Sequence, residues 1–146
     1  YKNVRRKVIA EKYLVDESGV ELKDYKLYCF NGKVKLIMIN SDRNKECSTK
    51  ADYFDADFNH LNMTWGYEQS SVVPSKPLYF EEMKMLAEKL SKGIPHVRID
   101  FYIADNRVYF GEMTFFDGSG FDAFGDMKDA KMLGEWINLP KPVVKD

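Results

Sequence analysis

The sequence predicts an α+β fold in which helices pack on an antiparallel sheet. Three observations predict it. Asn31-Gly32, a residue pair that favours a two-residue hairpin turn, stands between two apolar runs. Apolar and polar residues alternate strictly over 97–103, as in a strand with one buried face. Apolar residues recur at helical spacing over 80–90.

The first half of the chain is predicted to consist mostly of strands. Residues 6–14 are expected to form a strand that ends at the turn cluster 16–19. Residues 24–30 and 33–39 form the hairpin. With a two-residue turn, one face of this hairpin carries Leu27, Cys29, Val34, Leu36 and Met38. Residues 40–77 are weakly patterned, with short strands expected near Tyr53 and Leu61.

The second half is predicted to hold two helices and a second hairpin. A helix over 77–90 ends before Gly93 and Pro95. Two strands, 97–103 and 109–115, are joined at 104–107, and the glycine-rich turn Gly118-Ser119-Gly120 follows them. Asp126 can cap a short helix that reaches Ile137.

Composition indicates one folded domain over residues 1–146. The chain is 45% hydrophobic and 14% aromatic, and its formal net charge of −1 gives no electrostatic reason to expect a nucleic-acid partner. Cys29 and Cys47 lack the spacing of a zinc site or a disulfide framework, which favours a cytoplasmic location. No apolar run has the length of a transmembrane segment. Because the chain starts without methionine and enters directly into a segment expected to be folded, we expect it to be part of a longer protein.

Two carboxylates, Asp100 and Glu112, are predicted to lie on one sheet face. A loop with an odd number of residues places Asp100 opposite Glu112 and Arg98 opposite Thr114, whereas a two-residue loop would place the carboxylates on opposite faces. The odd loop is favoured because it gathers one apolar face, formed by Val97, Ile99, Phe101, Met113 and Phe115.

Such a pair favours a cation. Two carboxylates about 5 Å apart repel by about 3 kcal/mol at an effective dielectric constant of about 20. Magnesium suits oxygen ligands of this kind when it also binds nucleotide phosphates. The alternative is a solvated sheet face on which Arg98 partly neutralises the pair.

Several segments resemble the C-terminal lobe of the ATP-grasp fold, and more specifically the TupA-like branch, which is associated with teichuronopeptide and other cell-surface polysaccharide biosynthesis. They are residues 10–14 (Ala-Glu-Lys-Tyr-Leu), Asp24-Tyr25-Lys26, 97–101 (Val-Arg-Ile-Asp-Phe), 109–115 (Tyr-Phe-Gly-Glu-Met-Thr-Phe) and 118–121 (Gly-Ser-Gly-Phe). The resemblance implies an enzyme that uses ATP and Mg²⁺ to phosphorylate a carboxylate, which an amine or similar nucleophile then attacks.

The resemblance also implies roles for individual residues. Asp100 and Glu112 would hold magnesium, and Thr114 stands where ATP-grasp enzymes commonly have asparagine. Arg98 would face the transferred phosphoryl group, and Ser119 would line the acceptor side with its neighbouring glycines. The nucleotide would be bound by Glu11, Lys12, Tyr13 and Leu14 at adenine, Asp24 at ribose and Lys26 at phosphate. Arg43 and Lys50 could add phosphate contacts from the irregular segment.

The leading hypothesis is therefore an ATP- and Mg²⁺-dependent carboxylate ligase of cell-surface polysaccharide biosynthesis, whose substrate is a carboxylate-bearing glycan or an amino acid. One alternative is a nucleotide- or glycan-binding domain without turnover, because the first ATP-grasp lobe would precede Tyr1. Another is a sheet-rich interaction domain whose carboxylate pair is merely solvated.

Overall fold

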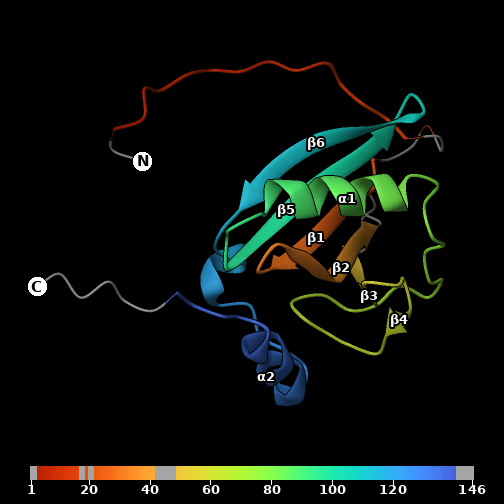
Figure 1. Ribbon diagram of the computed structural model, residues 1–146. Helices are drawn as coiled ribbons and strands as arrows, with labels where there is room; N and C mark the ends of the chain where they lie inside the picture. Colours follow the sequence, from red (N-terminus) through yellow and green to blue (C-terminus); the bar gives the residue numbers. More distant parts are fainter. Residues whose placement is uncertain (1–2, 17–18, 20–21, 42–48, 141–146) are drawn as a thin grey trace, which may run out of the picture.

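A computed structural model describes residues 3–16, 19, 22–41 and 49–140 of the chain. Six strands form one antiparallel sheet in the order β4-β3-β2-β1-β5-β6 (Figure 1). The strands are β1 (Asp24–Phe30), β2 (Lys33–Ser41), β3 (Lys50–Asp55), β4 (His60–Leu61), β5 (His96–Ala104) and β6 (Arg107–Thr114). The helices are α1 (Phe80–Leu90) and α2 (Met127–Glu135), and a 3₁₀ turn, η1, spans Asp117–Gly120. The predicted α+β fold is confirmed.

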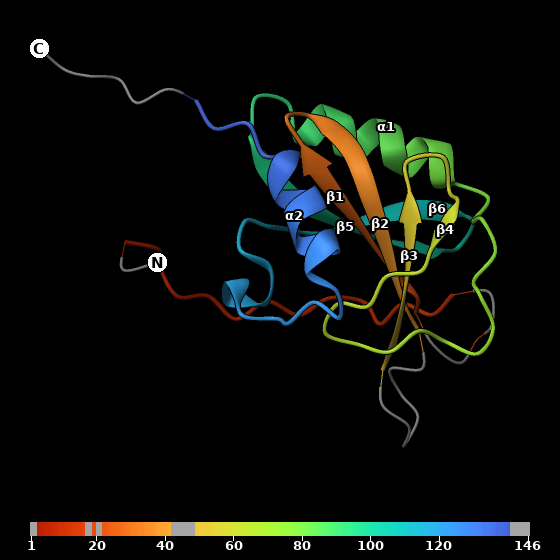
Figure 2. The same ribbon diagram turned by 90° about the horizontal axis from the view of Figure 1, so that it is seen from below.

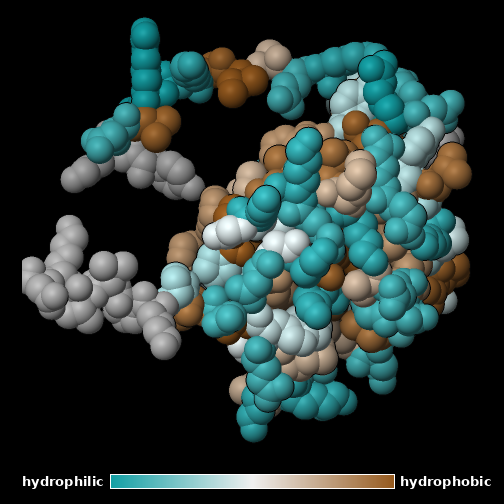
Figure 3. All heavy atoms as spheres, in the orientation of Figure 1, coloured by the Kyte–Doolittle hydropathy of each residue, from teal (hydrophilic) through white to brown (hydrophobic). Residues whose placement is uncertain are grey.

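The two helices lie on opposite faces of the sheet (Figure 2). Phe80, Met83 and Ala87 of α1 are buried against one face of the sheet. The outer surface on the α1 side of the molecule is mostly hydrophilic (Figure 3). Leu133 of α2 packs on the other face in a second cluster that includes Tyr28. As the sequence indicated, Asp126 caps α2, since its carboxylate accepts a hydrogen bond from the backbone N–H of Lys128 at 2.8 Å.

The first hairpin turns at Asn31-Gly32, as predicted, with both residues at positive φ. Its ladder is broken, however, because Cys29 pairs with Val34 while Tyr28 pairs with Leu36. This β-bulge reverses the faces of the residues beyond it. Leu36 and Met38 therefore lie in the cluster that contains Tyr28, and Ile37 and Ile39 pack with Leu27 and Cys29. The predicted placement of Leu36 and Met38 was wrong.

The second hairpin has a two-residue turn, Asp105-Asn106, in which both residues have positive φ, and the predicted odd loop was wrong. A β-bulge restores the predicted facing. Ile99 pairs with Met113 and Phe101 with Phe110, so two residues, Gly111 and Glu112, stand against Asp100 alone. Arg98 consequently pairs with Thr114, as expected from the sequence.

Two further predictions were wrong. Residues 6–14 form no strand: the segment runs outside the sheet, on the side opposite α1 (Figure 2). Its apolar residues Val8 and Ile9 are adjacent instead of alternating, and both stay exposed, so no apolar face holds the segment in the sheet. Phe115 lies just beyond the end of β6 and is 53% exposed instead of joining the core.

The weakly patterned segment does contain the two short strands expected near Tyr53 and Leu61, which are β3 and β4. Among the described residues, no helix is long and apolar enough to cross a bilayer.

Candidate active site

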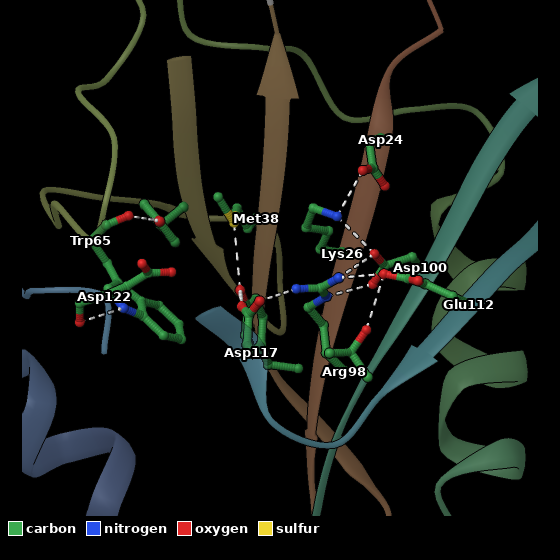
Figure 4. A network of polar contacts seen from close by, with 12 residues as sticks. Asp24, Lys26, Met38, Trp65, Arg98, Asp100, Glu112, Asp117 and Asp122 are labelled. Carbon is green, nitrogen blue, oxygen red and sulfur yellow. Dashed lines mark hydrogen bonds and ion pairs between the residues drawn. The ribbon is translucent and has the colours of Figure 1, made fainter. Parts of the chain in front are cut away.

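A group of charged side chains lies on the sheet face opposite α1, with Arg98 of β5 at its centre (Figure 4). Arg98 holds Asp100 through two hydrogen bonds, from Nε and Nη2, each of 2.7 Å. Nη2 also donates to Glu112 Oε1 at 2.8 Å, and Nη1 donates to Asp117. One guanidinium therefore joins carboxylates from β5, β6 and the η1 turn.

Lys26 of β1 extends this group across the next strand. The register pairs Lys26 with Asp100, and Lys26 Nζ lies 2.7 Å from Asp100 Oδ2 and 2.7 Å from Asp24 Oδ2. Asp24 is 2% exposed and Asp100 is 1% exposed. We call these six residues the charged cluster: Asp24, Lys26, Arg98, Asp100, Glu112 and Asp117.

The cluster keeps its two cations charged. Burial opposes the charged form of Lys26, but Asp24 and Asp100 outweigh it and raise the pKa of Lys26 above the ordinary value. Burial likewise opposes the charge of Arg98, but Asp100 and then Asp117 raise the pKa of Arg98. Lys26 and Arg98 thus stand as two cations among four carboxylates, so the cluster attracts further positive charge when those carboxylates are ionised.

The donor set fits magnesium bound together with phosphates. Asp100 and Glu112 both accept from Arg98 Nη2, so those two carboxylate oxygens lie within the combined length of the two hydrogen bonds. Thr114 Oγ1 donates to Glu112 Oε1 at 3.0 Å. No group of three or more His, Cys, Asp or Glu side chains suited to a metal was found among the described residues. Mg²⁺ commonly uses only one or two carboxylates and completes its shell with water and substrate phosphates.

The solvated-face alternative does not describe Asp100, which is buried. That alternative does fit Glu112 in part, because the Glu112 side chain is 61% exposed to solvent, although it also contacts Arg98.

Two cavities flank the charged cluster. The first has a volume of about 980 Å³ and lies between the extended N-terminal segment and the hairpin of β5 and β6, where Glu112 lines it. The second has a volume of about 310 Å³, and Lys26, Arg98 and Asp117 line it. The cluster therefore stands between two spaces that could each hold a ligand.

A family model described as TupA-like ATPgrasp matches residues 1–138 of the chain. The chain belongs to the TupA-like ATP-grasp family. Comparisons with curated proteins and with solved structures gave no significant match. The six-stranded antiparallel sheet with its two helices is consistent with an ATP-grasp domain.

In this TupA-like ATP-grasp chain, most of the predicted site residues come together. The charged cluster and its neighbour Thr114 contain six of them: Asp24, Lys26, Arg98, Asp100, Glu112 and Thr114. The predicted adenine segment, Glu11, Lys12, Tyr13 and Leu14, lines the first cavity together with Glu112, although it is not a strand.

Two of the predicted residues that the structure describes stand apart from this arrangement. Ser119 is exposed and is not among the residues that line either cavity, although its neighbour Gly118 lines the second. Lys50 forms an ion pair of 2.7 Å with Glu68. Arg43 lies outside the described residues.

Sequence reasoning missed Asp117, Asp122 and Trp65, which line the second cavity. Asp117 stands directly before Gly118, a position where an acidic residue beside a glycine turn could have drawn notice. Trp65 and Asp122 are 57 residues apart and meet through a hydrogen bond from the indole Nε1 to the Asp122 carbonyl at 3.3 Å. No local pattern in the sequence indicates that contact.

Proposed function

We propose that the protein is an ATP- and magnesium-dependent carboxylate ligase that forms an amide or similar bond through an acyl phosphate. The observation that carries this proposal is the charged cluster, which stands between two cavities on one sheet face of an ATP-grasp chain. A ligase of this kind needs a nucleotide site and an acceptor site that meet where the phosphoryl group is transferred.

The first cavity is the proposed nucleotide site. Glu11, Lys12, Tyr13 and Leu14 line one side of it, and Tyr109 and Phe110 line the other, so an adenine ring could lie between backbone and aromatic groups. Lys26, which lines the neighbouring second cavity, is the proposed charge for phosphate oxygens that reach the charged cluster. Asp24, which contacts Lys26 and lines neither cavity, is the proposed acceptor for ribose hydroxyls. The volume of about 980 Å³ is ample for a nucleotide.

Asp100, Glu112 and Thr114 are the proposed magnesium site. When bound, magnesium would neutralise the phosphate charge that a nucleotide brings to this face. Arg98 already lies between the two carboxylates, and its planar, permanently charged group is suited to stabilise negative charge on the transferred phosphoryl group.

The proposed reaction has two steps. A carboxylate oxygen of the substrate attacks the γ-phosphorus of ATP, the bond to the β-γ bridging oxygen breaks, and ADP leaves. The nitrogen of the acceptor then attacks the carbonyl carbon of the acyl phosphate, inorganic phosphate leaves, and the nitrogen loses a proton. Holding both substrates on one face would supply much of the rate enhancement through proximity.

The substrate class follows from the family's association with cell-surface polysaccharides. We propose a carboxylate-bearing glycan, such as a uronic acid, joined to an amino acid. Ser119, at the exposed tip of the η1 turn, is the proposed contact to the acceptor side.

The proposal is tested by measuring ADP formation by the full-length protein with a uronic acid, an amino acid, ATP and Mg²⁺, and by trapping the acyl phosphate with hydroxylamine. Wild type should form ADP and a hydroxamate, and Asp100→Asn and Glu112→Gln should each lower the rate by at least about tenfold. Asp57→Asn, which changes a carboxylate 85% exposed in the turn after β3, serves as the matched control. ADP formation that is absent in wild type, or unchanged in both cluster variants, would contradict the proposal.

A further inference from the structure

The second cavity has an aromatic wall that the proposed chemistry leaves unassigned. It is formed by Tyr28, Tyr53, Trp65 and Tyr67, and Asp122 and Gly118 stand beside it. We call this space the aromatic cavity. It shares Arg98 and Asp117 with the charged cluster, so a molecule bound there would lie next to the proposed site of phosphoryl transfer.

The polar atoms of three of these rings are already engaged within the protein. Tyr53 Oη donates to the Trp65 carbonyl at 2.6 Å, Trp65 Nε1 donates to the Asp122 carbonyl, and Tyr28 Oη donates to Asp117. Trp65 is further fixed by stacking on Phe124, with ring centroids 4.6 Å apart. Tyr28 and Tyr53 are fully buried and support the wall from behind, so the aromatic surface open to a ligand belongs to Trp65, which is partly exposed, and to Tyr67, which is 45% exposed.

Asp122 places a carboxylate beside this wall. Figure 4 shows its carboxylate on the side of Trp65 that faces Asp117. The side chain lies against two glycines in left-handed conformation, and a Cβ at Gly118 would be 2.0 Å from Asp122 Oδ2. In the part of the chain that the structure describes, neither a hydrogen bond nor an ion pair was found for this carboxylate, whereas Asp117 is bound by Arg98.

Aromatic surfaces and an available carboxylate together form the chemistry that recognises an ammonium ion. Lys26 and Arg98 do not oppose a cation, because both already contact carboxylates of the charged cluster, in which carboxylates outnumber cations. We infer that the aromatic cavity captures the amine acceptor in its protonated form, with Asp122 as the counter-ion. The ammonium then passes one proton to Asp122 or to water, so that the neutral amine attacks the acyl phosphate. This inference rests on the proposed function, because it assigns the acceptor of that reaction to a place in the fold.

The volume limits what the cavity can hold. About 310 Å³ accommodates an aminoalkyl group or a small amino acid, but not a sugar chain. The amine is therefore inferred to be the small partner, and the carboxylate-bearing glycan would approach from the open side of the cluster.

The inference is tested with simple probes on the full-length protein. Ethylammonium is titrated by ligand-observed NMR, with 1-propanol as the neutral probe of similar size and methyl glucoside as the sugar probe. Ethylammonium should bind at least about tenfold more tightly than either neutral probe. Asp122→Asn should weaken it by roughly tenfold, and Trp65→Leu by roughly three- to tenfold. Asp57→Asn is again the matched control, and thermal melting verifies that each variant is folded.

Two outcomes would overturn the inference. One is equal binding of 1-propanol or methyl glucoside and ethylammonium, and the other is unchanged ethylammonium affinity in folded Asp122→Asn. Titration of wild type with MgATP gives a separate readout. If MgATP binds and ethylammonium does not, the acceptor assignment alone fails. If ethylammonium binds but no ADP is formed with any amine, the ligase proposal alone fails.

Discussion

Arg98 holds the charged cluster together. Its three nitrogens contact Asp100, Glu112 and Asp117, which come from three different elements, and the residue is only 6% exposed. Burying Asp100 is tolerable because the guanidinium compensates its charge. Arg98 therefore acts both in the stability of the sheet face and in the proposed chemistry.

Removing the Arg98 charge should destabilise the fold. Arg98→Met leaves buried Asp100 without its bidentate partner, and we expect the free energy of unfolding to fall by about 3 kcal/mol or more. Urea unfolding measures this value, with Lys89→Met on the exposed side of α1 as the control. Mg²⁺ should restore more stability to Arg98→Met than to wild type, because it would supply the missing positive charge. A loss below about 1 kcal/mol, or no difference in the response to Mg²⁺, would speak against this account of the cluster.

His96 should make stability depend on pH. It packs against Phe30 with centroids 4.4 Å apart, and burial lowers the pKa of His96 although its hydrogen bond with the Cys29 carbonyl opposes that effect. Because this pKa is lower in the folded protein, the unfolded chain binds the proton more readily. His96 therefore stabilises the fold at pH values above 6.5, its ordinary pKa, and this stabilisation is lost as the pH falls below 6.5.

The measurement is the free energy of unfolding at pH 7.5 and pH 5.5 for wild type and His96→Gln. Wild type should lose more stability than the variant between the two values, and the difference isolates His96 from other titrating groups. An equal loss in both proteins would show that His96 does not contribute to the pH dependence.

At the scale of the elements, the β-bulge at Gly111 positions the carboxylate pair. A Cβ on Gly111 would lie 2.9 Å from a ring carbon of Tyr102 and 3.1 Å from the Asp100 carbonyl oxygen. Gly111→Ala should therefore shift Glu112 relative to Asp100 and weaken MgATP binding by roughly tenfold. Titration calorimetry of the full-length variant measures this, with Gly134→Ala as the control because a Cβ there meets open space. Unchanged affinity in Gly111→Ala would show that the bulge does not set the geometry of the site.

The two hairpins show which features a sequence can predict. Asn31-Gly32 and the alternation over 97–103 correctly indicated the strands, since turn preference and strand period are local properties. The bulges could not be predicted, because they depend on contacts between strands. In the first hairpin, the bulge at Lys35 reversed the predicted faces of Leu36 and Met38. In the second hairpin, the bulge at Gly111 compensated for a turn one residue shorter than the predicted loop, so Arg98 still faces Thr114.

The same distinction applies to the site. Arg98, Asp100, Glu112 and Thr114 could be found from spacing along two strands, where parity limits the possible arrangements. Trp65 and Asp122 lie in irregular segments that meet through an isolated bridge between Trp65 and Phe124 and through single hydrogen bonds, and no periodicity connects them. The strand predicted over 6–14 is absent for a related reason: its apolar residues, such as Val8 and Ile9, stay exposed and pack on no face of the sheet.

In the molecule as a whole, the two faces of the sheet are used differently. The face covered by α1 is closed by an apolar core, whereas the opposite face carries the charged cluster and both cavities. The extended segment 11–14 borders the first cavity without joining the sheet. A nucleotide in that cavity would therefore touch backbone that is otherwise open to solvent.

Hydrogen exchange should report that contact. The amides of 12–14 lie outside the sheet ladder and should exchange rapidly in the free protein, and MgATP should slow them by severalfold or more. Residues 5–8, which are also exposed but do not line the cavity, serve as the internal control. Equal exchange in 12–14 with and without MgATP would remove the segment from the nucleotide site.

The most direct test of the central claim is calorimetric titration of the full-length protein with ATP, in the presence of Mg²⁺ and in the presence of a chelator. The charged cluster predicts that tight binding requires Mg²⁺, and that the Asp100→Asn, Glu112→Gln double variant loses at least about tenfold in affinity for MgATP while remaining folded. Equal affinity in wild type and double variant, with and without Mg²⁺, would contradict the claim that this sheet face binds a magnesium nucleotide.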